Sequence, residues 1–166
     1  MQNCESRARI TLSMVALFIS LFVSSSAVAQ RPEPRGPETP NFNLEIILRG
    51  QGFGLVKFRQ PNDEFFIVHL DVWLRGLEPD TNYLLQRAVD TNVDSNCTST
   101  AWLTLGKGLV PQSITTDETG TGREELFRNL SAFPPGSEFD IHFRVIEEDT
   151  SEVVLTSKCY QFTISQ

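Results

Sequence analysis

The chain has 166 residues, of which 40% are hydrophobic, and its 21 acidic and 14 basic side chains give a formal net charge of −7. An acidic surface repels phosphate backbones, and no basic stripe offsets that charge, so nucleic acid is excluded as a partner.

Residues 1–29 have the three-part form of a secretory signal: a basic start, an apolar run over 10–23, and small residues at Ala27 and Ala29. Cleavage before Gln30 would remove two arginines and one glutamate, leaving 12 basic and 20 acidic residues and a net charge of −8. The apolar run is shorter than the ~20 residues of a membrane-spanning helix, so we expect no stable membrane anchor after cleavage. The protein is therefore predicted to be secreted or periplasmic.

Residues 30–40 are rich in proline and have almost nothing to bury, which predicts an extended linker. Residues 41–166 are enough for one domain with a single core.

The signal in this domain is strand. Apolar and polar residues alternate with period two over 66–74 and 139–145. Shorter stretches of the same kind are expected at 43–49, 53–59, 82–89, 101–105, 112–116, 123–128, 152–156 and 159–165. Turn signals separate these stretches, and no segment has a convincing helical period. About eight to ten strands at this spacing predict an all-β fold, an antiparallel sandwich or barrel.

One short motif refines the fold prediction. In the stretch GLEPDTNYLL, Leu77, Pro79, Thr81 and Tyr83 form the pattern L-x-P-x-T-x-Y. This pattern resembles the corner between two strands in fibronectin type III and related immunoglobulin-like domains. The resemblance implies an antiparallel immunoglobulin-like β-sandwich, in which the tyrosine hydroxyl bonds to backbone a few residues upstream.

The corner is predicted to occur twice. Residues 76–89 align with 132–145 at an offset of 56, and Phe139 then takes the place of Tyr83. Each copy is followed by a polar stretch and a cysteine. The alternative is coincidence, because turns draw on a small set of residues.

Cys4 should leave with the signal, so Cys97 and Cys159 remain. An even pair in an exported chain predicts one disulfide, because that compartment is oxidising. Two unpaired buried thiols are the alternative.

Oxygen-bearing side chains occupy alternate positions after the stretch 82–89, as at the start of a calcium loop: Asp90, Asn92, Asp94 and Asn96. An EF-hand is excluded, because its sixth position is Ser95 and its twelfth is Ala101. A looser calcium site, completed by another loop, and a loop that satisfies its own backbone are both compatible with the sequence. Calcium is the only cofactor that the sequence suggests.

The tryptophans are the best candidates for ligand binding. Trp73 shares a strand face with Asp71 and Arg75, and both it and Trp102 are predicted to lie opposite the apolar face. An exposed aromatic beside hydrogen-bonding groups is suited to stacking on a sugar or anchoring a protein partner. The alternative is a tryptophan covered by a loop or by the linker.

Copper-zinc superoxide dismutases are similar secreted sandwiches, but His69 and His142 alone cannot supply their metal cluster, and both histidines are predicted to be exposed. No serine lies in a G-x-S-x-G elbow, and no catalytic residue is predicted. We therefore expect an exported, non-catalytic recognition module for a glycan or an extracellular protein. A small metal-dependent enzyme or a calcium-stabilised module is the alternative.

Overall fold

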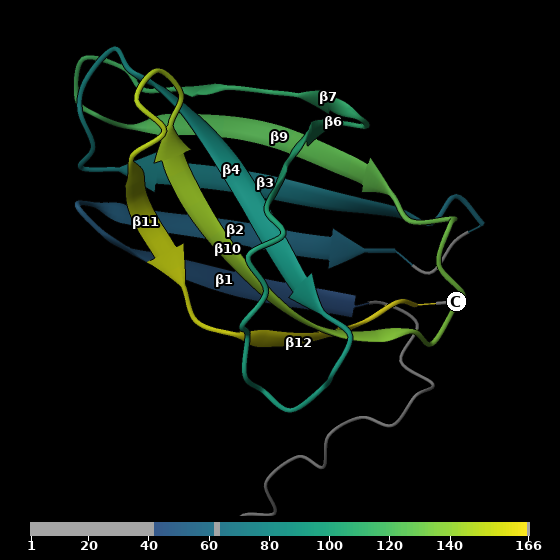
Figure 1. Cartoon of the computed structure of the whole chain (residues 1–166). Coiled ribbons are helices and arrows are strands. Elements are labelled where there is room, and N and C mark those ends of the chain that lie inside the picture. Colours follow the sequence, from purple (N-terminus) through teal and green to yellow (C-terminus); the bar gives the residue numbers. More distant parts are fainter. Residues whose placement is uncertain (1–41, 62–63, 166) are drawn as a thin grey trace, which may run out of the picture. The chain divides into compact units, whose positions relative to one another are not determined.

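The computed structural model describes residues 42–61 and 64–165, and every regular element in them is a strand (Figure 1). The predicted signal peptide and linker lie outside these residues. No helix that could cross a membrane is found in the described part of the chain.

Eight strands of four or more residues build most of the fold: β1 (Phe42–Gly50), β2 (Phe53–Gln60), β3 (Ile67–Arg75), β4 (Asn82–Asp90), β9 (Gly122–Asn129), β10 (Glu138–Glu147), β11 (Val153–Ser157) and β12 (Tyr160–Thr163). Four two-residue strands accompany them: β5 (Leu103–Thr104), β6 (Gly106–Lys107), β7 (Val110–Pro111) and β8 (Ile114–Thr115).

The strands form one large sheet in the order β5-β4-β10-β11-β1-β2-β3-β9-β6-β7, with β12 paired to β10 and β8 to β4. The sheet folds over so that β4 and β10 cross in front of β1, β2 and β3 (Figure 1). β11 joins the two layers, because it pairs with β10 on one side and with β1 on the other. The architecture is therefore all-β and nearly barrel-like.

Residues 105–108 form a crossing segment that connects β4, near one end of the sheet, to β9, near the other end. The backbone N–H of Leu105 donates to Leu85 O at 2.8 Å, and Gly108 N–H donates to Phe127 O at 2.9 Å. Between these bonds β6 meets β9 in a parallel bridge at Lys107 and Phe127. The sheet is thus mixed at this point, where a purely antiparallel arrangement was expected.

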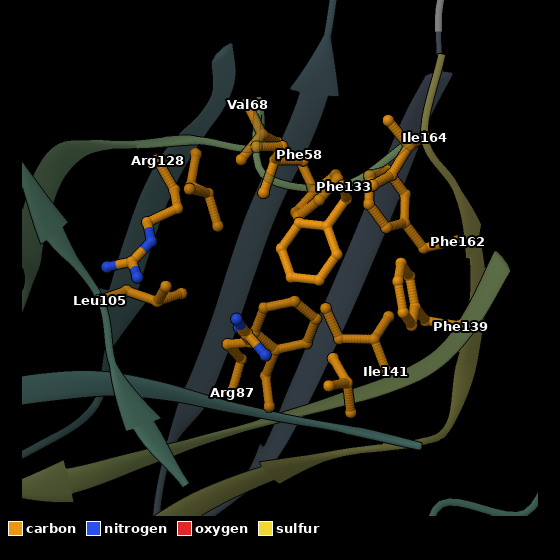
Figure 2. Close-up of a pocket in the computed structure, with 14 residues that line it drawn as sticks. Phe58, Val68, Arg87, Leu105, Arg128, Phe133, Phe139, Ile141, Phe162 and Ile164 are labelled. Atoms are coloured by element: carbon orange, nitrogen blue, oxygen red, sulfur yellow. The ribbon is translucent and has the colours of Figure 1, made fainter. Parts of the chain in front are cut away.

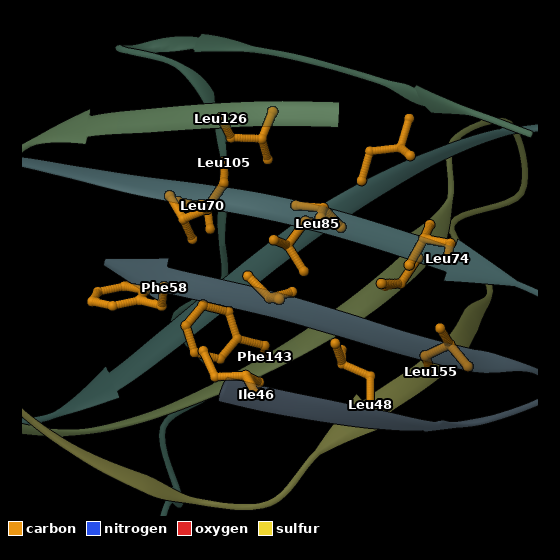
Figure 3. Packing of buried hydrophobic residues seen from close by; sticks show 14 of the residues in the cluster. Ile46, Leu48, Phe58, Leu70, Leu74, Leu85, Leu105, Leu126, Phe143 and Leu155 are labelled. Atoms are coloured by element: carbon orange, nitrogen blue, oxygen red, sulfur yellow. The ribbon is translucent and has the colours of Figure 1, made fainter. Parts of the chain in front are cut away.

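The core lies between the layers, where the apolar residues of the alternating strands meet (Figure 3). Ile46 and Leu48 on β1, Leu70 on β3 and Leu85 on β4 are all at most 1% exposed. The period-two pattern therefore identified the inward faces of the long strands correctly.

The differences from the expected strands have local causes. Phe66 was predicted as the first residue of its strand, but its φ of 51° is a left-handed conformation that ends the extended backbone, and β3 begins at Ile67. The stretches 101–105 and 112–116 shrink to two residues each, in β5 and β8. β6 and β7 were not predicted, because their own residues do not alternate between apolar and polar. They pair as strands because the crossing segment brings β6 beside β9.

The corner around Tyr83 has the hydrogen bond that the motif implied. Its buried hydroxyl accepts from Glu78 N–H at 3.2 Å. Thr116, which is 2% exposed, completes the corner, since its hydroxyl donates to Glu78 O at 2.6 Å and accepts from Thr81 N–H at 3.0 Å. In the second copy Phe139 has no hydroxyl, and its ring instead packs edge-on against Phe133, with 5.5 Å between the centroids.

The predicted disulfide is present. Cys97 and Cys159 are bonded with their Cα atoms 5.4 Å apart, at a sequence separation of 62. The bond joins the loop after β4 to the residue just before β12. The strands β4 and β12 both pair with β10.

Candidate functional site

The outer face of the layer formed by β1, β2, β3 and β9 carries a cluster of arginines and aromatic rings. The cross-strand register places Arg49 opposite Phe53, Phe53 opposite Arg75, and Trp73 opposite Arg123. We call these five residues the arginine–aromatic patch. Trp73 and Arg75, predicted from sequence as ligand-binding residues, both belong to it.

Cation–π contacts hold the patch together. The guanidinium groups of Arg49 and Arg75 lie 4.5 and 4.6 Å from the centroid of the Phe53 ring. Because β2 lies between β1 and β3, they reach that ring from opposite sides. The Trp73 ring has Arg75 at 5.3 Å and Arg123 at 5.8 Å, and it meets Phe53 edge-on at 6.2 Å.

The three arginines of the patch have no ion pair or side-chain hydrogen bond to other described residues; the ion pair found in that part of the chain joins Lys107 to Glu124 at 2.9 Å. A guanidinium stacked on a ring keeps its N–H groups free to donate in its own plane. The patch therefore presents donors suited to carboxylate or sulfate oxygens, while arginines occupy the ring faces on which a neutral sugar would stack.

Asp71 lies in the next row of the same face. Its register partners are Lys57 on β2 and Glu125 on β9, so Asp71 lies between a lysine and a second carboxylate. Asp71 and Trp73 together line a broad depression of about 730 Å³, and Arg123 lines it as well. Three of the sequence-predicted residues are thus brought together on one surface.

Trp102 lies elsewhere, over the outer face of β10. Its ring centroid is 4.6 Å from that of His142, and the Arg144 guanidinium lies 4.1 Å from the Trp102 ring. Arg144 Nε in turn donates to Gln86 Oε1 at 2.7 Å. This packing leaves His142 only partly exposed, where full exposure was expected, and its Nε2 lies 3.1 Å from Ser99 O. Trp102 is partly exposed, as Trp73 is, but it is not part of the patch.

In the acidic loop over residues 90–96, side-chain oxygens are engaged by the loop's own backbone. Asp90 Oδ2 accepts from Thr98 N–H and Ser99 N–H at 3.2 and 3.1 Å. Asp94 Oδ1 accepts from Asn96 N–H at 3.0 Å, and Asn92 Nδ2 donates to Asp94 Oδ2 at 2.6 Å. No group of three or more His, Cys, Asp or Glu side chains able to hold a metal is found in the described ranges.

Asp140 occupies a polar position in the alternation over 139–145, which predicts an outward side chain, but it is completely buried beneath this loop. Its Oδ2 accepts from Asp94 N–H at 2.9 Å and Ser95 N–H at 2.6 Å. The carboxylate, which belongs to β10, thus fixes the loop from below by accepting two of its backbone N–H groups.

Sequence reasoning missed a cavity that adjoins the core and is partly open to solvent. It has a volume of about 50 Å³ and an almost entirely apolar lining, with Arg87 and Arg128 on one side and the rings of Phe133, Phe139 and Phe162 on the other (Figure 2). Burial lowers the pKa of the Arg87 guanidinium, and the nearby charge of Arg128 lowers it further. The sequence could have revealed both arginines, because residues two apart in a strand lie on the same face. Arg87 is two residues after the buried Leu85, and Arg128 is two residues after the buried Leu126.

Comparison with known proteins adds no assignment: no family model, curated protein or solved structure matches the chain.

Proposed function

We propose that this protein is an exported, non-catalytic recognition module that binds an acidic protein partner through the arginine–aromatic patch. The observation that carries the proposal is the set of three guanidinium groups, Arg49, Arg75 and Arg123, which aromatic rings hold in place and no described carboxylate neutralises. Such preorganised donors lose little side-chain freedom when they bind a carboxylate.

The composition of the surface favours a protein over a neutral glycan. Tryptophan and arginine are the residues most enriched at the energetic centres of protein interfaces. Ile47, 36% exposed, and Leu55 extend the row of Trp73 across β1 and β2, so apolar surface adjoins the charged donors. A neutral sugar would have to displace the arginines in order to stack on Trp73.

An acidic glycan is the second candidate. The three guanidinium groups come from β1, β3 and β9, so they spread across the face in a line and match a linear polyanion as well as an acidic peptide. Carboxylate and sulfate groups on sugars would accept the same bidentate hydrogen bonds.

The proposal includes an exported immunoglobulin-like sandwich. The Glu78–Tyr83 hydrogen bond supports that fold, and the disulfide supports export, since such bonds persist in oxidising compartments. The rival, a calcium-stabilised module or small metalloenzyme, would have to use the acidic loop.

Retention on immobilised polyanions tests the patch. Because the predicted mature chain has a net charge of −8, it should be retained on poly-glutamate only through a local cationic surface. We expect retention at low salt, and loss of retention in Arg75→Gln and in Trp73→Ala. Arg59→Gln is the matched control, since Arg59 is exposed on the same face but outside the patch.

Polygalacturonate, tried in parallel, separates the two candidates. Stronger retention on poly-glutamate supports a protein partner, and stronger retention on polygalacturonate supports an acidic glycan. If Arg59→Gln weakens retention as much as Arg75→Gln does, the binding is diffuse attraction and the proposal is wrong.

A further inference from the structure

We infer that this partly open cavity is a binding site for a small amphiphilic carboxylate, whose apolar tail enters the cavity and whose carboxylate is held by Arg87 and Arg128. The site lies on the core side of the strands, apart from the arginine–aromatic patch on the outer face, and does not depend on that patch.

The position of the two arginines is the first argument. On β4, Arg87 follows Tyr83 and Leu85 on the strand face that points inward. On β9, Arg128 follows Leu126 on the inward face of that strand. Strand geometry therefore directs both long cationic side chains toward the core, where arginine is rarely found without a partner.

The second argument is the missing counter-charge. No carboxylate lines the cavity in the described part of the chain, and the Arg87 guanidinium has no hydrogen bond or ion pair to another described residue. Arg128 Nη1 donates to Gly108 O at 3.3 Å, which leaves its charge uncompensated. Glu124, inward on the same strand as Arg128, is paired with Lys107. Two like charges that share a partly buried site are costly, and an anion between them removes that cost.

The cavity sets the size and polarity of the ligand. Its lining atoms are overwhelmingly apolar, with phenylalanine rings opposite the arginines (Figure 2). A volume of about 50 Å³ accommodates roughly four water-sized groups. A carboxylate with a tail of about four to six carbon atoms fits this space. A longer tail would have to displace Phe133, which is 40% exposed at the margin of the cavity.

The test uses the disulfide-bonded chain and the sodium salts of acetate, butyrate, hexanoate and octanoate, with 1-hexanol as the uncharged counterpart of hexanoate. Calorimetry at constant ionic strength should find the tightest binding for butyrate or hexanoate, with Kd on the order of 0.1 to 1 mM for so few atoms. At about ten times Kd the ligand should raise Tm by a few degrees.

The variants Arg87→Met and Arg128→Met keep an apolar stem of similar length and should each weaken hexanoate binding at least tenfold. Their Tm without ligand should equal or exceed that of the parent chain, because an unpaired charge is removed from a partly buried site. Arg59→Met, on the outer face, should bind hexanoate like the parent chain.

Three results would overturn the inference: no heat or Tm change with any of the acids at about 10 mM, acetate binding as tightly as hexanoate, or 1-hexanol binding as tightly as hexanoate. Acetate binding as tightly as hexanoate would mean that the arginines bind an anion but the cavity does not bind the tail. 1-Hexanol binding as tightly as hexanoate would mean that the cavity binds the tail but the arginines do not bind the carboxylate. Because the acid series is measured on the parent chain, the inference stays testable even if a variant fails to fold.

Discussion

The hydroxyl group of Tyr83 offers a direct test of how the corner stabilises the fold. Tyr83 is 1% exposed, and its hydroxyl is the acceptor for Glu78 N–H at 3.2 Å. Burial raises the pKa of this side chain, so the hydroxyl stays protonated throughout the neutral range. Tyr83→Phe removes the oxygen, keeps the ring, and leaves a partly buried N–H without its acceptor.

The expected loss follows from that unsatisfied donor. Removing one partner of a buried hydrogen bond costs about 1–3 kcal/mol, and the near-complete burial of Tyr83 favours a value of about 2 kcal/mol. For a domain of this size each kcal/mol lowers Tm by roughly 3–5 °C, so Tm should fall by roughly 6–10 °C.

Tyr160→Phe is the matched control. Its hydroxyl also accepts a backbone N–H, that of Ile47 at 3.1 Å, but in an exposed position. Water can replace the lost acceptor there, so we expect a loss of about 0.5 kcal/mol. Thermal and urea unfolding followed by tryptophan fluorescence would measure both variants. Equal losses in the two variants, or no loss at Tyr83, would refute the argument from burial.

Four further outcomes are expected. Gly120→Ala should cost more than about 3 kcal/mol in unfolding experiments, because φ is +69° and a Cβ would collide with the backbone oxygen of Leu77. Gly136→Ala, where φ is +79° but nothing lies within 4 Å of the added Cβ, should cost only about 1–2 kcal/mol. Replacing both Cys97 and Cys159 by alanine should lower stability by about 4 kcal/mol in urea, given the loop of 62 residues that the bond closes. Hydrogen bonds from the side chain of Thr119 and from the backbone N–H groups of Thr121 and Thr119 lower the pKa of the Asp117 carboxyl in the folded protein. The stability that Asp117 contributes is therefore present above pH ~4 and is lost as pH falls through the lower pKa of the folded state. Asp117→Asn should flatten that part of the curve of Tm against pH. A chelator should leave the melting curve unchanged, because the acidic loop uses its oxygens on its own backbone; a clear drop in Tm would support the calcium-stabilised alternative.

The long strands could be predicted because their information is local. In β3 and β10 every second residue is apolar, and this alternation alone identifies the inward face. The disulfide was predictable from the cysteine count and the expected compartment. The corner was predictable because its tyrosine, proline and threonine lie within one short stretch of the sequence.

The chain crossing between Leu105 and Gly108 could not be predicted. Its backbone groups are satisfied by Leu85 and Phe127, about 20 residues away in sequence on either side. No periodicity in the segment itself encodes these partners. For the same reason the sequence could not show whether the layers form an open sandwich or a nearly closed barrel, since that depends on how this segment links β4 to β9.

In both the patch and the cavity, the neighbours of a residue on other strands decide what it can bind. Trp73 and Arg75 were recognisable because the sequence places an aromatic ring beside hydrogen-bonding groups on an outward face, but what they bind depends on neighbours from other strands. It is the stacking of Arg49 on Phe53, set by cross-strand register, that favours an anion over a sugar ring. Arg87 was overlooked, because the faces of the stretch 82–89 were not assigned from the sequence. Its alternation with Leu85 turns it toward the core, where it is partly buried without a counter-charge, and the partner that we infer from the adjoining apolar space is an acid with a short tail.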